Sequence, residues 1–436
     1  MCYAIPGRVV SLSKTIATVD YFGEERKVRR DVAALSVGDY VYAQGGVLVS
    51  RIPEREAVGI LEAWRERFFE LKEVDRRISA ESAESKMSGN LLGILQKANL
   101  GKDLTKADLM VLLSSGGREE TKLLSGAANA LRQREHDNAC CVHGIIEFSN
   151  FCTQDCIYCG IRKGSRKAKR YRMSEEEIVE AARHAAKDLS FKAIVLQSGE
   201  DPWYDDGKLE RIVREVRKLD VLIFLSIGMR SHETYRKLYK AGARAALLRF
   251  ETADPALFER MRPGTTLEAR LKLIRDLRKM GYVIATGFLI GLPGETDEGL
   301  AESIMLSKSL EPDMHSFGPF IPAAGTPLSE ERMQGPEKAL RVTAAARLAD
   351  RRSKILVTTA LEVSGGREGT DAKRLGLLAG GNSLMIDVTP DRYRKLYTIY
   401  DGKAERAGAS RPVEERIKET VELLYSLGRA PTDLGM

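Results

Sequence analysis

The chain has 436 residues, of which 43% are hydrophobic and 30% are charged. This composition supplies a large apolar core and excludes a disordered, collagen-like or low-complexity protein. No apolar run approaches the roughly 18 residues that a membrane-spanning helix needs, and the first thirty residues lack a signal-peptide pattern. We therefore expect a cytoplasmic protein with no membrane partner.

The net charge of +7 comes from one segment. Arg162–Arg172 (RKGSRKAKRYR) contains seven basic residues and no acidic one, and the rest of the chain is neutral. A nucleic-acid-binding protein carries its positive charge over a whole face, so we expect no nucleic-acid partner. The segment is predicted to form a lip that favours anionic ligands.

The amino-terminal part of the chain is predicted to be a small β-barrel. Residues 1–52 alternate apolar and polar positions in short runs that are separated by glycines. An amphipathic helix follows over about Glu54–Val74. The polar stretch 76–90 has little to bury, so we assign residues 1–75 to a first domain, 76–90 to a linker and 91–436 to a second domain.

The second domain shows the pattern of a (β/α)8 barrel. After a helical stretch over 91–134, apolar β-like runs alternate with helical segments. In such a barrel the chemistry lies where the strands end. The eight predicted strands are His143–Ser149, Lys192–Gln197, Val221–Ser226, Ala245–Phe250, Tyr282–Ile290, Met314–Phe320, Ile355–Ala360 and Ser383–Val388.

Three of the six cysteines lie within eight residues, directly after the first predicted strand. The sequence CTQDCIYC gives Cys152, Cys156 and Cys159 a C-x3-C-x2-C spacing. Three thiolates on one loop can hold a single 4Fe–4S cluster and leave one iron without a protein ligand. Structural zinc normally takes four ligands, and a disulfide would leave an odd thiol. We therefore favour the cluster. Cys140 and Cys141 are expected to be buried thiols.

This spacing resembles that of the radical S-adenosylmethionine (SAM) superfamily. Further segments resemble HydE-type maturases of iron–iron hydrogenases from about residue 88 almost to the end, while biotin synthase and methylornithine synthase share the barrel and the cluster motif. The matching segments include LQSGEDP (196–202), RFETADPALFERMRPG (249–264) and GPFIPAAGTPL (318–328).

The resemblance implies two cofactors, one 4Fe–4S cluster and SAM, and a 5′-deoxyadenosyl radical made from them. Glu200 is expected to hold the SAM ammonium, Arg270 its carboxylate and Glu251 its ribose. The residues expected to contact SAM are Tyr158, Gln197, Ser198, Gly199, Glu200, Ser226, Glu251 and Arg270.

The resemblance also implies residues that contact the substrate. Arg249 is expected to anchor an anionic substrate, because a charged residue in an apolar strand needs a partner or a wet cavity. His143 departs from the family pattern, in which an Arg usually opens this strand. The residues expected to contact substrate are His143, Arg249, Met314, Thr358, Thr359, Met385 and Tyr393.

The opening sequence MCYAIPGRVV resembles that of the HypC/HupF family of hydrogenase maturation chaperones, which are small barrels with a C-terminal helix. The resemblance implies that Cys2 holds an iron carrying cyanide and carbonyl ligands, a role that suits a soft thiolate. The family commonly has a His where this chain has Gln44.

Together these patterns predict an α/β fold: a TIM-type (β/α)8 barrel of the radical SAM class after a small N-terminal β-barrel. The expected substrate is a small organometallic iron(CO)(CN)–cysteine precursor of a hydrogenase cluster. The expected partners are a reductant protein and other hydrogenase maturation proteins. One alternative is a radical SAM mutase or lyase acting on an amino acid or sulfur heterocycle. Another is a non-catalytic iron-carrier scaffold with a structural cluster.

Overall fold

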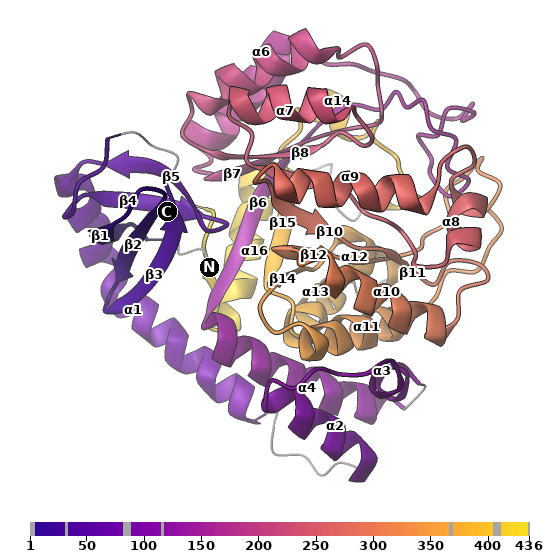
Figure 1. Ribbon diagram of the computed structural model, residues 1–436, viewed down its shortest axis with the longest axis horizontal. Helices are drawn as coiled ribbons and strands as arrows, with labels where there is room; N and C mark the ends of the chain where they lie inside the picture. The colour runs from indigo at the N-terminus through magenta and orange to yellow at the C-terminus, as the bar shows by residue number, and fades with distance from the viewer. Residues whose placement is uncertain are drawn as a thin grey trace.

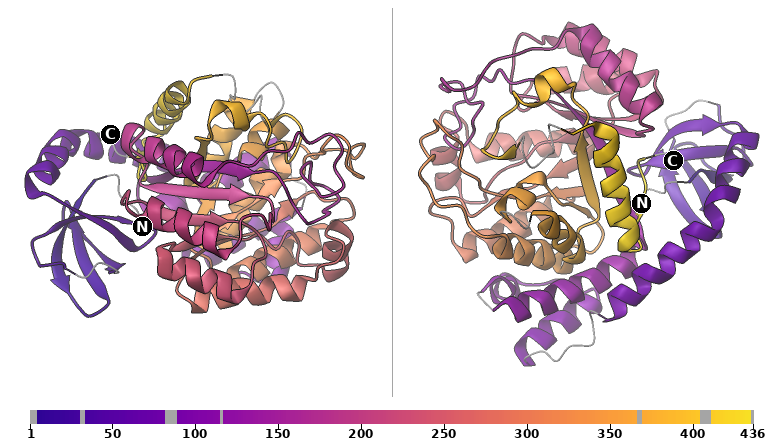
Figure 2. Two further views of the ribbon diagram at one scale, coloured as in Figure 1. Left: turned by 90° about the horizontal axis from the view of Figure 1, so that it is seen from above. Right: turned by 180° about the vertical axis from the view of Figure 1, so that it is seen from behind.

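The computed structural model describes residues 5–30, 34–81, 89–114, 117–365, 369–403 and 411–434. It contains a small barrel and a large barrel that lie side by side (Figures 1 and 2). Cys2 lies outside the described residues, as do residues 82–88 of the predicted linker.

The small barrel is closed by five strands in the order β1-β2-β3-β5-β4, with β1 paired to β4. Apolar side chains alternate with exposed ones in the first strands, which gives the barrel its own core around Val19, Val41 and Leu48. The strands are β1 (Gly7–Leu12), β2 (Ile16–Tyr21), β3 (Glu24–Arg29), β4 (Tyr40–Gln44) and β5 (Val47–Ile52).

Helix α1 (Glu54–Glu81) runs from the small barrel along the large one (Figure 1). It continues to Glu81, so residues 76–81 of the expected linker are helical. Asp75 and Ser79 are buried and contact Arg132 of α4, which explains why the helix extends into this polar sequence. The helices that follow are α2 (Gly89–Asn99), α3 (Lys106–Leu113) and α4 (Arg118–His136).

Eight parallel strands form the large barrel, which closes by pairing β15 with β6. This confirms the predicted fold class. A short strand, β16 (Ala430–Pro431), adds to the outside of the first half of β6. The eight strands are β6 (Ala139–Ser149), β7 (Ala193–Ser198), β8 (Leu222–Ser226), β9 (Ala245–Leu247), β10 (Val283–Thr286), β12 (Met314–Ser316), β14 (Lys354–Leu356) and β15 (Ser383–Asp387).

Four predicted strands were too long, and one of them, Ala245–Phe250, ends at Leu247. Two of them are interrupted by a bend and resume as the separate pair β11 (Leu289–Ile290) and β13 (Gly318–Pro319). At this bend Gly287 lies so close to β12 that a Cβ would be 2.2 Å from the Ser316 carbonyl oxygen. The predicted strand Ile355–Ala360 ends at Leu356, and Thr359 begins helix α12.

The helices that cover the barrel begin at polar caps. Ser174 and Glu177 form a capping box at α5, and Asp205 caps α6. The remaining helices are α5 (Glu175–Arg183), η1 (His184–Asp188), α6 (Asp206–Arg217), α7 (His232–Ala241), α8 (Pro255–Met261), α9 (Leu267–Lys279), α10 (Asp297–Ser309), α11 (Pro336–Ala349), α12 (Thr359–Ser364), α13 (Gly369–Leu378), α14 (Asp391–Arg394) and α16 (Val413–Ser426).

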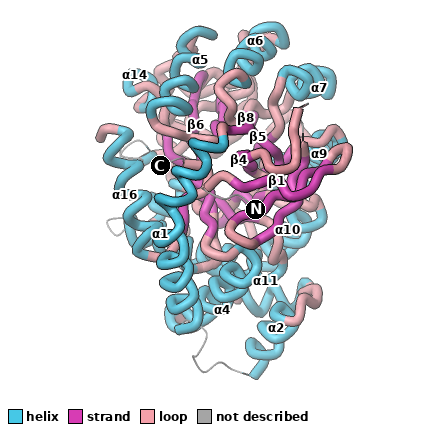
Figure 3. Tube along the Cα trace, turned by 90° about the vertical axis from the view of Figure 1, so that its left-hand side faces the viewer, coloured by secondary structure: helices cyan, strands magenta, loops and turns pink. Residues whose placement is uncertain are grey.

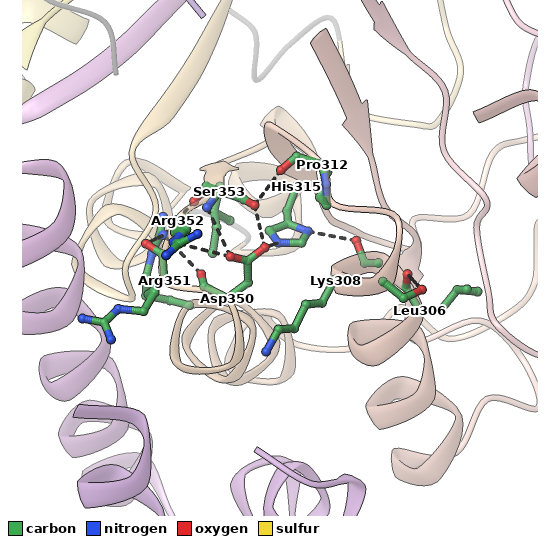
Figure 4. A network of polar contacts seen from close by, with 12 residues as sticks. Leu306, Lys308, Pro312, His315, Asp350, Arg351, Arg352 and Ser353 are labelled. Atoms are coloured by element: carbon green, nitrogen blue, oxygen red, sulfur yellow. Dashed lines mark hydrogen bonds and ion pairs between the residues drawn. The ribbon is translucent and has the colours of Figure 1, made fainter. Parts of the chain in front are cut away.

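A polar network joins β12 to its two covering helices (Figure 4). His315 lies 2.8 Å from the Ser307 hydroxyl of α10 and 2.9 Å from the carboxylate of Asp350, which follows α11. Burial would raise the pKa of Asp350, but hydrogen bonds from His315 and Ser353 outweigh it and lower that pKa. The network fixes both helices at the outer side of the barrel wall.

The hairpin between β4 and β5 closes the large barrel at its amino-terminal end (Figure 3). Val47 and Val49 share one apolar cluster with Leu222, Ala245 and Val283, which begin or lie near the start of barrel strands. Gly45, at the hairpin tip with φ +58°, packs against Leu222, where an added Cβ would be in ordinary contact at 3.4 Å from a methyl group. The small barrel therefore fills the end of the large barrel opposite the expected site.

None of the helices in the described parts of the chain combines the length and apolar character needed to cross a lipid bilayer.

Candidate active site

A cavity of about 920 Å³ opens at the carboxyl ends of the barrel strands. Its lining contains the three clustered cysteines, every predicted SAM contact and four of the seven predicted substrate contacts. These lining residues are Cys152, Cys156, Cys159, Tyr158, Gln197, Ser198, Gly199, Glu200, Ser226, Glu251, Arg270, Arg249, Thr358, Thr359 and Met385. The structure thus brings together residues that are as far as 233 positions apart in the sequence.

The cysteine loop follows β6 and is held by main-chain hydrogen bonds. Thr153 N donates to the Glu200 carbonyl at 3.0 Å, and Ile157 N donates to the Met261 carbonyl at 3.0 Å. Gly160 ends the loop against Thr398, whose carbonyl oxygen would lie 2.1 Å from an added Cβ. The loop has no helix or strand of its own, yet these contacts fix its path.

The three thiols lie in a site that suits a metal cluster. Burial raises the pKa of Cys152, Cys156 and Cys159, to about 12 for Cys159. Metal ligation requires thiolates, so bound iron would displace these protons. Glu200 N, 3.4 Å from Cys152 Sγ, donates toward a sulfur, as is common around iron–sulfur clusters. The residues present therefore fit a cluster with three cysteine ligands.

Two arginines converge on Glu200 beside the cysteines. Arg262 Nη2 lies 3.5 Å and Arg270 Nη2 lies 3.8 Å from the same carboxylate oxygen. All three side chains are buried, and Gly228, with φ +70°, leaves room for Glu200 because a Cβ there would lie 2.2 Å from its Cγ. Arg270 Nη2 has no hydrogen-bond partner among the described residues. The group can accept a ligand that carries both a cation and a carboxylate.

Glu251 has a left-handed backbone conformation, with φ +65°. Such a conformation costs a non-glycine residue about 1–3 kcal/mol and is concentrated at functional sites. The Glu251 carboxylate lies 3.2 Å from Arg249, whose guanidinium faces Thr358 across Gly318. The Thr358 hydroxyl is buried without a hydrogen-bond partner among the described residues. This wall of the cavity offers a cation and a hydroxyl to an anionic ligand.

A chain of polar contacts crosses the inner wall of the cavity. Lys403 Nζ donates to Glu147 Oε2 at 2.7 Å, and Gln197 Nε2 donates to Glu147 Oε1 at 3.2 Å. The Ser226 hydroxyl then donates to Gln197 Oε1 at 3.1 Å. Two of the predicted SAM contacts, Gln197 and Ser226, are therefore oriented through Glu147, which is the register partner of Gln197 on the neighbouring strand.

Three predicted substrate residues do not line the cavity. His143 lies below its floor, in contact with Asp433. Met314 belongs to the apolar cluster that fills the barrel beneath the cavity. Tyr393 stacks on Tyr171 outside the barrel wall, with ring centroids 4.9 Å apart.

Sequence patterns missed Arg262, Glu147 and Lys403, all of which line the cavity. Glu147 could have been found, because it is a charged residue inside a mostly apolar strand, two positions before the strand ends. No local signal marks Lys403, which reaches the cavity from a segment far along the chain.

Much of the basic segment Arg162–Arg172 is used to hold the cysteine loop. Arg170 donates to the carbonyl oxygens of Asn150 and Ile161, the latter at 2.9 Å. Arg172 pairs with the buried Asp201 at 2.7 Å. Its lysines, such as Lys163 and Lys167, are exposed next to the loop.

Comparison with known families divides the chain in the same way as the two barrels. Residues 146–306 match the family model described as the radical SAM superfamily, and residues 1–64 match that of the HupF/HypC family.

Curated relatives cover most of the large barrel. The chain is 40% identical to the FeFe-hydrogenase maturase subunit HydE of Thermotoga maritima over 304 residues, which are 69% of this chain and 85% of the relative. It is 31% identical to 3-methylornithine synthase of Methanosarcina acetivorans over 338 residues, which are 76% of this chain and 91% of that enzyme.

Solved structures show the same architecture. Methylornithine synthase (PylB) aligns with a TM-score of 0.66 and 29% identity, covering 78% of this chain and 97% of that one. HydG, described as a maturase of the FeFe-hydrogenase, aligns with a TM-score of 0.65 and 18% identity over 82% of each chain, a likeness of fold.

Proposed function

Because this chain belongs to the HydE family of radical SAM enzymes, with a HupF/HypC-type module fused in front, we propose that it acts on a small organometallic iron–cysteine precursor in hydrogenase maturation. The observation that carries the proposal is the 40% identity to HydE across a barrel whose cavity contains the cysteine loop and its surrounding charges. Family membership makes the chain an enzyme and removes the hypothesis of a non-catalytic scaffold.

Radical SAM enzymes bind a 4Fe–4S cluster and SAM, which together supply a 5′-deoxyadenosyl radical when an electron is delivered. In this chain Cys152, Cys156 and Cys159 would hold the cluster at the mouth of the barrel. The residues that we propose for SAM are Tyr158, Gln197, Ser198, Gly199, Glu200, Ser226, Glu251 and Arg270, together with Arg262.

The charged side chains beside the cysteines bind the oppositely charged groups of SAM. The Glu200 carboxylate accepts hydrogen bonds from a bound ammonium, while Arg270, buried and with an unused donor, binds a carboxylate. Arg262 donates to the Tyr158 hydroxyl at 3.2 Å and keeps that ring against the cysteine loop. Burial of these groups strengthens each interaction, because little water competes for it.

The wall that contains Arg249 and Thr358 is the proposed substrate site, next to the SAM contact Glu251. Arg249 and the unpartnered Thr358 hydroxyl favour an anionic ligand, and Thr359 and Met385 line the same cavity. An iron complex that carries cyanide and thiolate ligands is anionic. Its polarizable ligands would pack favourably against the polarizable thioether of Met385. The cavity of about 920 Å³ has room for SAM and a small second molecule.

The activity is tested with the full chain, reconstituted anaerobically with iron and sulfide, reduced and mixed with SAM. We expect 5′-deoxyadenosine, and we expect Cys156→Ala to abolish both the cluster spectrum and this product. Cys140→Ala is the matched control, because Cys140 is buried outside the cavity. No deoxyadenosine from the cluster-loaded chain would contradict the proposal.

Methylornithine synthase supplies a second candidate function, an amino-acid rearrangement. It is favoured by the 31% identity and by the structural match over 97% of PylB. Offering lysine and an iron–cysteine carbonyl–cyanide complex separately distinguishes the two candidates. Conversion of lysine to a rearranged isomer, with no consumption of the iron complex, would replace the hydrogenase proposal.

We propose that the N-terminal module carries or receives an iron fragment, or docks another maturation protein. Its match to the HupF/HypC family supports this role, and Cys2 is the residue proposed to hold iron. A pulldown with hydrogenase maturation proteins, comparing the full chain with Cys2→Ala, tests it. Equal iron loading and equal partner capture by the two proteins would make the module purely structural.

A further inference from the structure

Three potential metal ligands meet at the closed end of the large barrel. Cys141 and His143 lie on alternate residues of β6, and Asp433 follows β16, the strand that pairs with the start of β6. One ligand atom from each residue lies within 4.8 Å of the other two, and all three side chains are buried.

The contacts within this group, which we call the lower cluster, are short and polar. His143 Nε2 lies 2.8 Å from Asp433 Oδ2, and neither Asp433 carboxylate oxygen accepts a well-aligned hydrogen bond from the described residues. The Thr432 hydroxyl lies 3.4 Å from Cys141 Sγ. His143 Nδ1 has no hydrogen-bond partner among the described residues.

The N-terminal module reaches the lower cluster through Gln44. This residue ends β4, and its Nε2 donates to the Thr432 carbonyl at 2.9 Å, one residue before Asp433. The Gln44 side chain is fully buried, and its Oε1 has no partner in the part of the chain that the structure describes. A buried amide oxygen without a partner is costly, and it is also a competent metal donor.

The position is distinct from the proposed SAM cavity. None of the three ligands lines that cavity, whereas the inward residues further along β6, Ile145 and Glu147, do. The His143 ring packs on Phe224 with centroids 5.0 Å apart, and Met385 lies opposite His143 in the β15–β6 register. These apolar side chains separate the lower cluster from the floor of the cavity.

The donor set has the charge and softness of a divalent transition-metal site. A thiolate, a carboxylate and a neutral imidazole balance the charge of a dication, so the occupied site adds no net charge to the interior. At bond lengths of about 2.0–2.3 Å, tetrahedral ligand atoms lie roughly 3.3–3.8 Å apart. To bind an ion, the His143–Asp433 pair would open by about half an ångström, and Cys141 Sγ, now within 4.8 Å of the other two ligand atoms, would come within this range.

We propose that Cys141, His143 and Asp433 bind one Zn²⁺ or Fe²⁺ ion, and that this ion fastens the N-terminal module to the barrel through the adjacent Gln44–Thr432 contact. The site is buried and structural, and its three ligands leave one coordination position to a further donor such as the unpartnered Gln44 Oε1. The site is separate from the iron–sulfur cluster and does not depend on the proposed reaction.

The test uses the full chain with Cys2, Cys152, Cys156 and Cys159 changed to Ala, which leaves Cys140 and Cys141 as the remaining cysteines. The protein is refolded or expressed with zinc, ferrous iron or cobalt(II), and bound metal is measured after desalting. We expect one ion per chain, and with cobalt(II) a thiolate-to-metal absorption band and intense tetrahedral d–d bands. Preference for zinc or iron is read from direct competition between them.

Neighbouring cysteines provide a matched pair of variants. Cys141→Ser is expected to remove the ion and the cobalt–thiolate band, whereas Cys140→Ser, one residue away and facing the helix layer, retains both. If Cys141→Ser fails to fold, the isosteric Asp433→Asn tests the same ligand set. The proposal is overturned if the four-alanine protein, before either serine substitution, binds less than a tenth of an ion per chain. It is also overturned if the Cys141→Ser and Cys140→Ser proteins bind equal amounts of metal.

Discussion

Lys403 donates a buried hydrogen bond to Glu147 inside the barrel, with Nζ 2.7 Å from Oε2. Burial raises the pKa of Glu147 from 4.5 to about 8, although the Lys403 ammonium lowers it; nearby Asp387 adds to the rise. Between these two values the folded chain holds a proton that the unfolded chain releases. The protonation of Glu147 therefore contributes fully to the free energy of unfolding below the pKa that Glu147 has in the unfolded chain. This contribution is lost as the pH rises toward about 8.

The variant Glu147→Gln removes this titration while keeping the side-chain shape. Relative to the variant, the wild-type free energy of unfolding should fall with rising pH, by at most about 1.4 kcal/mol per pH unit. Denaturant unfolding of both proteins across about pH 5–8 measures the difference. Parallel stability profiles would show that Lys403 keeps Glu147 ionised throughout this range.

Arg262 joins the Tyr158 hydroxyl to the Glu200 carboxylate, at 3.2 Å and 3.5 Å. Arg262→Lys keeps the charge but loses the planar fork that makes both contacts. We expect SAM affinity to fall about tenfold to a hundredfold, equivalent to the ~1.5–3 kcal/mol of a hydrogen bond to a charged group. Calorimetric titration of the cluster-loaded protein with SAM measures the change.

Arg260→Lys is the control for that substitution. Arg260 lies in the last turn of the short helix α8, which Arg262 caps, but it is exposed and lies outside the cavity lining. Its SAM affinity should match that of the wild type. If Arg262→Lys also binds SAM normally, Arg262 has no part in holding the cofactor.

The sequence predicts which chemical groups line the cavity. It does not predict how far into the barrel the cavity extends. The C-x3-C-x2-C spacing and the residues at strand ends are local features, and the barrel then brings their side chains to one mouth because parallel strands end together. The sequence does not reveal which inward residue faces the cavity and which faces the closed end. His143 and Glu147 both point inward from β6, yet the N-terminal hairpin fills the barrel below His143 and leaves Glu147 in the cavity.

The contacts between the two modules could not be predicted for the same reason. The stretch 76–90 looks like a linker because it is polar, but its residue Ser79 and the preceding Asp75 contact the buried Arg132 of α4. Periodicity identifies apolar faces, and it misses a helix that is fixed by a buried charge network.

Asp75 balances two buried arginines from the large barrel. Its carboxylate accepts from Arg132 at 2.6 and 2.7 Å and from Arg429 at 3.1 Å, and all three side chains are inaccessible to solvent. Burial, followed by repulsion from Arg132, lowers the pKa of Arg429 to about 10. Asp75→Asn should cost about 3–5 kcal/mol, because it leaves two buried cations uncompensated.

Glu73→Gln is the matched control for Asp75→Asn in helix α1. Glu73 forms an exposed pair with Arg76 at 2.8 Å, so its loss should cost about 0–1 kcal/mol. Urea unfolding of the full chain measures both substitutions. Equal effects would mean that water reaches the Asp75 network.

Val47 and Val49 place the N-terminal module inside the core of the barrel, since both side chains are buried with Leu222 and Val283. The chain should therefore unfold in one transition, and Val47→Ala should lower its free energy of unfolding by about 1.5–3 kcal/mol. Val37→Ala, at a side chain 62% exposed on the same module, should change the free energy of unfolding little.

Intrinsic fluorescence and circular dichroism during unfolding report on the two modules together. If Val47→Ala shifts an early transition and leaves a later one unchanged, the hairpin covers the barrel without stabilising it. A single transition shifted as a whole would show that the N-terminal module is part of the structure that holds the catalytic barrel closed.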